Sequence, residues 1–265
     1  MSNQAEVNGK FGLLTKDQFG FMPVTSKGMP GRKCFFRDFE VMTFIFETDE
    51  DEAVKWIPKE LQLDSSPAIA RIMCCHYKHT SVGRYNEVIL GFNVLWQGEP
   101  RVYYPHLYVS GWVPMFSGRE MVGFPKTLAN ITWKREEESI LCYVERPEGK
   151  RIVTCHMHPD DFLDPKLIVP RKYILLKSIP GLEEGGLAVA QLIEGDSIAS
   201  ASVLGSDGKA EQYTGVGNVT YDSPCEFDPW YRISVNKMLA CTYGRFNGAM
   251  DTQKNFRIIK DYLNN

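Results

Sequence analysis

The chain has 265 residues, with 30 Lys and Arg against 33 Asp and Glu, which gives a net charge of −3 at pH 7. This near balance supplies no basic surface for neutralising phosphates, so the composition argues against a nucleic-acid partner. With 43% hydrophobic residues and no repeat or linker, the chain is expected to fold as a single domain over residues 1–265.

The sequence also bears on the compartment of the protein. No apolar stretch reaches the ~20 residues of a membrane-spanning helix, and the N-terminus lacks the pattern of a secretory signal. The seven cysteines show no tight spacing framework, which favours reduced thiols over disulfides. We therefore expect a cytoplasmic protein with no membrane partner.

Most of the chain consists of short runs rich in β-branched and aromatic residues, which is typical of strands. Such runs occupy residues 41–46, 68–77, 87–96, 102–109 and 140–144. Turn residues between runs predict hairpins at 97–100, 147–150 and 206–208, so sequential antiparallel pairing should follow.

Helical signals are fewer. Acidic residues at 49–52, followed by Pro58, predict a short helix over residues 48–57. Two more helices are predicted over 228–241 and 256–263 from their apolar spacing. The composite is an α+β fold, predominantly antiparallel β. Its curved, cone- or barrel-like sheet, with a few flanking helices, would enclose a pocket for a small ligand.

One lysine has an unusual setting in the segment Gly118–Leu128. Lys126 follows Phe124 and Pro125 and precedes Leu128, so its amine is expected in partly apolar surroundings. Desolvation disfavours the charged form of a lysine, and a neutral amine can attack a ketone. The product, a Schiff base, withdraws electrons from the neighbouring carbon and eases loss of carbon dioxide or a proton.

The Gly-Arg-Glu and Phe-Pro-Lys pattern of residues 118–126 resembles the active-site signature of the acetoacetate decarboxylase superfamily. The helix before Pro58, the segment 85–87 ahead of an apolar strand and the terminal segment 258–263 resemble that family in the same order. The resemblance covers nearly the whole chain. It implies a cone-like antiparallel fold and a homo-oligomeric assembly.

The resemblance places Lys126 on the Schiff-base lysine and Glu87 on a glutamate near the reacting carbon. Glu87 also begins an apolar strand, where a buried carboxyl could carry protons to and from the imine. The family arginine that handles the substrate carboxylate falls near Phe39 and Glu40, and the nearest candidate is Arg37. For Arg37 a surface ion pair with Asp38 or Glu40 is favoured over substrate binding.

Two departures from the family pattern concern the substrate. The second family lysine, directly after the first, is replaced here by Thr127, so desolvation must do more to keep the amine neutral. A second pocket glutamate falls near Arg71 or Ile72 and is absent. Both departures weaken the case for acetoacetate itself more than the case for Schiff-base chemistry.

Three further side chains are candidates for substrate binding. Phe124 stands beside the lysine in sequence, and Arg119 and Glu120 could line the pocket mouth. For the adjacent pair of opposite charges, a structural hydrogen-bonding role is favoured.

Metal and nucleotide sites find little support. Residues 74–79 and 155–158 cluster Cys and His, but strand alternation would turn neighbouring side chains to opposite faces. The Gly215-Val216-Gly217 run lacks the third glycine and the helix of a dinucleotide site. No metal and no cofactor are expected.

The leading hypothesis is therefore a cofactor-independent Schiff-base lyase that decarboxylates a small β-keto acid, with Lys126 as nucleophile and Glu87 as proton carrier. An aldolase-dehydratase that joins pyruvate to an aldehyde would use the same imine. A non-catalytic β-barrel-like module that binds a small apolar ligand, with Phe124 and Trp112 lining its cavity, is the alternative from another class.

Overall fold

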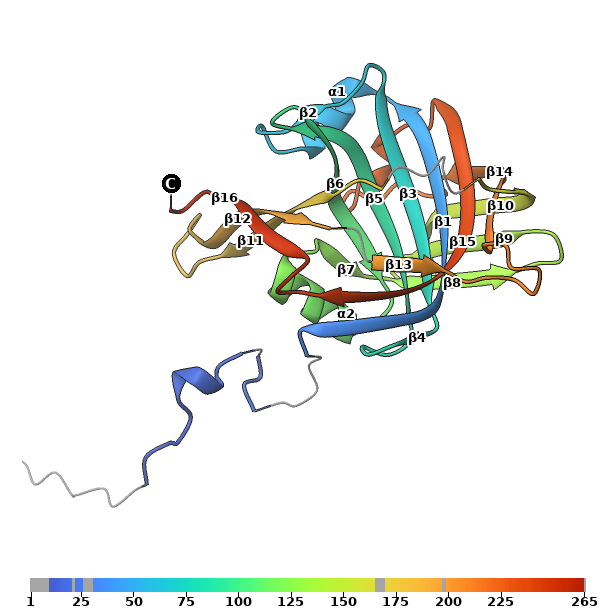
Figure 1. The fold of residues 1–265 in the computed structure, drawn as a ribbon. Helices are drawn as coiled ribbons and strands as arrows, with labels where there is room; N and C mark the ends of the chain where they lie inside the picture. The colour runs from blue at the N-terminus through green and yellow to red at the C-terminus, as the bar shows by residue number, and fades with distance from the viewer. Residues whose placement is uncertain (1–9, 21, 26–30, 165–169, 197–198, 265) are drawn as a thin grey trace, which may run out of the picture.

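A computed structural model describes residues 10–20, 22–25, 31–164, 170–196 and 199–264 (Figure 1). The strands are β1 (Lys33–Thr48), β2 (Gln62–Leu63), β3 (Ala68–Tyr77), β4 (His79–Thr80), β5 (Tyr85–Trp96), β6 (Glu99–Val109), β7 (Lys126–Leu128), β8 (Asn130–Arg135), β9 (Ile140–Glu145), β10 (Arg151–Phe162), β11 (Tyr173–Pro180), β12 (Leu187–Gly195), β13 (Ala199–Ser202), β14 (Gln212–Thr220), β15 (Lys237–Asp251) and β16 (Phe256–Asp261). The helical turns are η1 (Lys16–Gln18), α1 (Glu50–Ala53), η2 (Val54–Trp56), α2 (Trp112–Ser117), η3 (Gly118–Val122) and η5 (Trp230–Arg232).

The described strands form one continuous, curved sheet. Its main path runs in the order β16-β12-β11-β6-β5-β3-β1-β15-β14-β10-β9-β8. Almost all neighbouring strands are antiparallel, while β7 and β11 pair with β6 in parallel. The expected α+β class, dominated by an antiparallel curved sheet, is confirmed.

The curvature creates two apolar compartments on opposite faces of the central strands. The larger core lies between two layers: the even-numbered side chains of β3 and β5 on one side, and strands β8 to β10 on the other. Asn86 on β5 links the layers by donating a hydrogen bond to the Ile131 carbonyl of β8. The second compartment lies on the other face. Cys75, Tyr85 and Leu107 line this second compartment. Strands β15 and β16, which are joined by residues 252–255, lie at its border (Figure 1).

Several local predictions are confirmed. Strand β3 matches residues 68–77, and the predicted helix near Pro58 exists as α1 followed by η2, with the Asp49 side chain accepting a hydrogen bond from the Glu52 N–H. The hairpin between β5 and β6 turns at Gln97 and Gly98, which both have positive φ as a type I′ turn requires.

Two of the predicted helices are wrong. Residues 228–241 contain only the short turn η5 before β15 begins, and residues 256–263 form β16. Strand β15 pairs with β1 from Lys237 to Asp251, and β16 pairs with β12. The apolar spacing suited both a helix and a strand, and pairing with distant strands decided the outcome.

Residues 10–20 and 22–25 extend away from the sheet (Figure 1). Within the described ranges of the chain, no helix is both long and apolar enough to cross a membrane.

Candidate active site

A buried lysine and a buried glutamate meet in the second compartment. Lys126 begins β7, directly beside Leu107 of β6, and Glu87 lies on β5 opposite Val109 of β6. The Lys126 ammonium donates a hydrogen bond to Glu87 Oε1, and the two residues are only 6% and 4% exposed. The structure thus brings together the two residues predicted as nucleophile and proton carrier.

The surroundings of this pair are apolar and aromatic. Lys126 Nζ lies 5.2 Å from the ring centre of Phe124 and 5.8 Å from that of Tyr85. Burial, reinforced by the negative charge of Glu87, raises the pKa of both the Cys75 thiol and the Tyr85 hydroxyl. Both groups therefore stay neutral, and Lys126 and Glu87 are the groups positioned to exchange a proton here.

A π-helical turn places the lysine. In η3 the Gly123 N–H donates to the Gly118 carbonyl at 3.0 Å, and Gly123 ends the turn with a left-handed φ of 84°. Gly118 packs directly against the lysine side chain, because a Cβ at this position would lie 2.8 Å from Lys126 Cε. Phe124 and Pro125 then lead the chain into β7.

The charged residues of η3 hold this turn. Arg119 is exposed, and its Nη1 donates to the Lys126 carbonyl oxygen at 2.9 Å. Lys177 on β11 donates to the carbonyl oxygen of Glu120 at 2.6 Å, and burial lowers the Lys177 pKa. The Arg119 side chain thus contacts the main chain at the lysine, whereas Glu120 contributes its main-chain carbonyl. A part for either side chain in substrate binding stays a prediction.

Thr127, at the position of the second family lysine, points to the opposite face of the sheet. Its Oγ1 lies 2.8 Å from His106 Nε2, while the Trp230 indole donates to His106 Nδ1 at 2.6 Å. Burial lowers the His106 pKa to about 4, although nearby Asp228 opposes the shift, so the imidazole is neutral. Residue 127 therefore lies outside the compartment of Lys126.

Arg37 and Trp112 do not join the site. Arg37 is exposed on β1 and stacks over Phe35 at 5.8 Å. Trp112 is 60% exposed and lines a separate groove of about 930 Å³ together with Leu128 and Phe227. Phe124, by contrast, lies against the lysine as expected.

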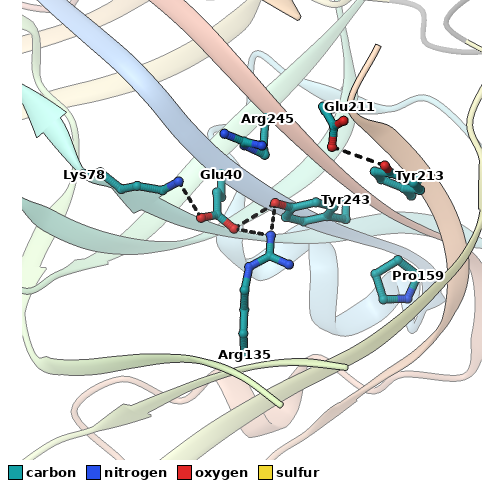
Figure 2. A pocket seen from close by; sticks show the side chains of 8 residues that line it. All are labelled: Glu40, Lys78, Arg135, Pro159, Glu211, Tyr213, Tyr243 and Arg245. Atoms are coloured by element: carbon teal, nitrogen blue, oxygen red, sulfur yellow. Dashed lines mark hydrogen bonds and ion pairs between the residues drawn. The ribbon is translucent and has the colours of Figure 1, made fainter. Parts of the chain in front are cut away.

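The position aligned with the family arginine lies in a pocket of its own. A backbone irregularity at Asp38 turns Phe39 toward the lysine compartment and Glu40 to the other face. There Glu40 lines a pocket of about 470 Å³ (Figure 2). The residues around it are Lys78, Arg135, Pro159, Glu211, Tyr213, Tyr243 and Arg245.

The charges of this pocket compensate one another. Glu40 accepts hydrogen bonds from Arg135 at 2.7 Å and Tyr243 at 2.8 Å, and pairs with Lys78 at 2.9 Å (Figure 2). Burial alone would raise the pKa of Glu40, but these hydrogen bonds hold it below its usual value. Within the pocket Glu40 is thus compensated by Lys78 and Arg135, while Arg245 pairs with Asp38 at 2.8 Å outside the lining.

The cysteine and histidine clusters singled out in the sequence are split between faces. Cys74 meets Cys142 and Cys155 in the large core, whereas Cys75 faces the lysine. Across the described part of the chain, no group of three or more His, Cys, Asp or Glu side chains is arranged to hold a metal ion.

Sequence reasoning missed three contributors. Tyr85 stands two positions before Glu87, and strand alternation could have placed it on the same face. Gly118 belongs to the motif, but its contact with the lysine depends on the π-helical turn. Lys177 comes from a distant strand and has no local signal.

Comparisons with known proteins identify the family of this chain. The family model described as acetoacetate decarboxylase matches residues 21–263. The decarboxylase DEC1 of Cochliobolus heterostrophus is 27% identical over 218 residues, covering 79% of this chain and 82% of the relative. The acetoacetate decarboxylase of Burkholderia cenocepacia is 31% identical over 120 residues, which is 45% of this chain and 48% of that protein.

Solved structures share the fold. An acetoacetate decarboxylase structure superposes with a TM-score of 0.83 at 21% identity, covering 94% of this chain and all of that one. The enduracididine biosynthesis enzyme MppR in complex with pyruvate gives a TM-score of 0.73 at 15% identity, covering 90% of this chain and 94% of that one. With a family model that spans nearly the whole chain, this protein belongs to the acetoacetate decarboxylase family.

Proposed function

We propose that the protein is a Schiff-base lyase that decarboxylates a β-keto acid without a cofactor. The observation that carries the proposal is the buried contact between the Lys126 ammonium and Glu87, in a chain that matches the acetoacetate decarboxylase family model and has decarboxylases among its relatives. In the proposed reaction one proton passes from Lys126 to Glu87, and the neutral amine that results is the nucleophile.

The covalent steps balance with these two groups and water. The Lys126 amine attacks the keto carbon, a C–N bond forms and water leaves to give a protonated imine. The C–C bond to the carboxylate then breaks and carbon dioxide departs. The electron pair of that bond forms the enamine double bond, and the imine nitrogen becomes neutral. Glu87, which gave its proton to the departing water and regains one from solvent, protonates the resulting enamine at carbon, and water hydrolyses the imine to release the ketone.

The aldolase-dehydratase alternative uses the same imine. Thr127 in place of the family's second lysine favours it, because that replacement weakens the case for acetoacetate. The structural likeness to MppR at 15% identity concerns the fold. The orientation of Thr127 reduces the weight of this argument, because a side chain at this position does not contact the reacting amine.

Product analysis separates the two reactions. Purified protein is incubated with acetoacetate and longer β-keto acids, and in parallel with pyruvate and an aldehyde. Carbon dioxide release with the keto acids alone supports the decarboxylase, and a condensation product alone supports the aldolase-dehydratase. Carbon dioxide release by the Lys126→Ala variant at the wild-type rate would overturn both.

Two expectations from the sequence stay predictions. These are the homo-oligomeric assembly, which size-exclusion chromatography with light scattering would measure, and the cytoplasmic location.

A further inference from the structure

A second cationic side chain enters the compartment of Lys126. On β3, the even-numbered Ala70 and Ile72 belong to the large core, whereas Met73 and Cys75 face the other way. Arg71 shares the face of Met73 and Cys75 by strand alternation. It is therefore on the same wall as Cys75, the cross-strand partner of Glu87.

The Arg71 guanidinium lacks a carboxylate partner of its own. Its Nη2 donates to Asn93 Oδ1, and its Nε is buried without a hydrogen-bond partner. Among the described residues no carboxylate lies within ion-pair distance of Arg71. Asp64, the acidic residue whose charge acts on it, is bound to Arg171 at 2.6 Å. Two guanidinium groups thus share one carboxylate, which leaves one positive charge uncompensated.

Burying a cation without a counter-charge costs folding free energy unless an anionic ligand pairs with it. Burial lowers the Arg71 pKa, which is the expected sign of that cost. The side chain is nevertheless not fully enclosed, because part of its surface is solvent-accessible. An anionic group can therefore contact the accessible part of Arg71.

Tyr104 lies between the two ends of this wall. Its hydroxyl contacts Met73 Sδ at 3.7 Å. Burial raises the pKa of Tyr104, and the charge of Arg71 opposes that shift. Its ring packs over Gly91, where a Cβ would come within 2.8 Å of the ring carbons. Gly91 is the cross-strand partner of Arg71, so the ring covers the strand beside the arginine.

The spacing decides which part of a substrate Arg71 can contact. Arg71 and Cys75 are four residues apart on one strand, about 13 Å at the usual rise per residue. The carboxylate that leaves as carbon dioxide is attached to the carbon next to the imine carbon, so it stays near Lys126. Tight binding of that departing group would also stabilise the reactant more than the transition state.

From this arrangement we infer that Arg71 binds a second carboxylate of the substrate, several carbons from the keto group. The substrate class is then the 3-oxo dicarboxylic acids. The inference rests on the proposed Schiff-base function of Lys126 for the position of the keto group.

The test compares matched substrates. Wild-type protein is assayed with a series of 3-oxo dicarboxylates from 3-oxoadipate to 3-oxosebacate and with 3-oxo monocarboxylates of equal chain length. We expect kcat/KM to favour the dicarboxylate by ~10- to 100-fold at the best length, the range of a charge-assisted hydrogen bond. The Arg71→Met variant should lose this preference, and Arg71→Lys should retain part of it. The control Arg151→Met, at an exposed position on β10, should keep it.

A binding measurement separates this inference from the proposed chemistry. In the Lys126→Ala background, calorimetry with suberate should show binding that the added Arg71→Met substitution removes. If suberate binds but the wild-type protein decarboxylates none of the 3-oxo acids, the proposed function is wrong and Arg71 remains as an anion site. Decarboxylation of monocarboxylates and dicarboxylates at equal kcat/KM would overturn the role of Arg71 and leave the proposed function standing.

Discussion

At the scale of single residues, the account depends on a proton shared between Lys126 and Glu87. Replacing Glu87 with Gln keeps the shape of the side chain and removes its capacity to take and return a proton. We expect kcat to fall by about 100-fold or more, the range typical of general acid–base catalysis. Steady-state carbon dioxide release, with the fold checked by circular dichroism, measures this. Glu137→Gln, at an exposed position, is the control, and a Glu87→Gln variant with wild-type kcat would contradict the assignment.

Thr127 allows a second test, because the family lysine at this position has been linked to the reactivity of its neighbour. In this structure residue 127 contacts His106 on the face away from Lys126. A Thr127→Lys variant should therefore gain no activity. It should lose on the order of 1 to 3 kcal/mol of unfolding free energy from crowding a packed site.

Urea denaturation and the decarboxylase assay measure the two effects in the same preparation. Thr220→Lys, at an exposed position on β14, controls for the added charge. Increased turnover in Thr127→Lys would show that the side chain reaches the amine after all.

Sequence reasoning paired Lys126 with Glu87, which are in contact in the structure, but it did not predict the walls of their compartment. Lys126 and Glu87 followed from a local motif and a strand start. The role of Arg71 depends on which face of β3 it occupies and on what Asp64 binds, and both are set by contacts far apart in the chain. Arg37 was the nearest arginine in sequence, yet it lies exposed on β1.

At the scale of elements, η3 is the part that places the nucleophile. Gly118 has helical backbone angles, with φ −65° and ψ −43°, so alanine fits its backbone. The added methyl would nevertheless lie 2.8 Å from Lys126 Cε. We expect Gly118→Ala to lower kcat/KM by roughly 10-fold or more through displacement of the amine, while the melting temperature changes little.

Initial-rate kinetics and differential scanning calorimetry measure these two quantities. The control is Gly12→Ala, where a methyl group meets no atom within 4 Å. Unchanged kinetics in Gly118→Ala would mean that the lysine is not held by this contact.

The predicted strands 68–77 and 87–96 were well placed because each has a β-rich composition between turn residues. The predicted helices at 228–241 and 256–263 failed because β15 and β16 pair with β1 and β12, which are far away in sequence. The parallel pairing of β7 with β6 has no hairpin signal either, although it positions Lys126.

At the scale of the whole molecule, a buried histidine ties stability to pH. His106 has its pKa lowered from 6.5 to about 4, chiefly by burial, so the folded state binds its proton less readily than the unfolded state. The stabilisation is complete above the unfolded value and is lost as pH falls from about 6.5 to about 4. Its size is on the order of 3 kcal/mol at most.

Urea unfolding at several pH values across this window measures the slope. The His106→Gln variant should show a shallower fall than the wild type, because glutamine does not titrate. Identical slopes in the two proteins would show that His106 is not the group responsible.

The overall class of fold could be predicted, whereas the division into two compartments could not. Alternation along β3 and β5 indicates two buried faces, but only the long-range order of the sheet shows that β8 to β10 cover one face and that β15 and β16 border the other. Lys126 and Glu87 lie in the second compartment because of that order.

The covalent imine is the most direct measure of the account. Protein incubated with a β-keto acid and sodium borohydride, then digested and analysed by mass spectrometry, should carry the mass of a reduced adduct on the peptide containing Lys126. The Lys126→Ala variant should carry none. If the protein releases carbon dioxide and its Lys126 peptide is unmodified, the Schiff-base mechanism is contradicted. If it binds the keto acid without turnover and the peptide is unmodified, the protein is a binding module instead.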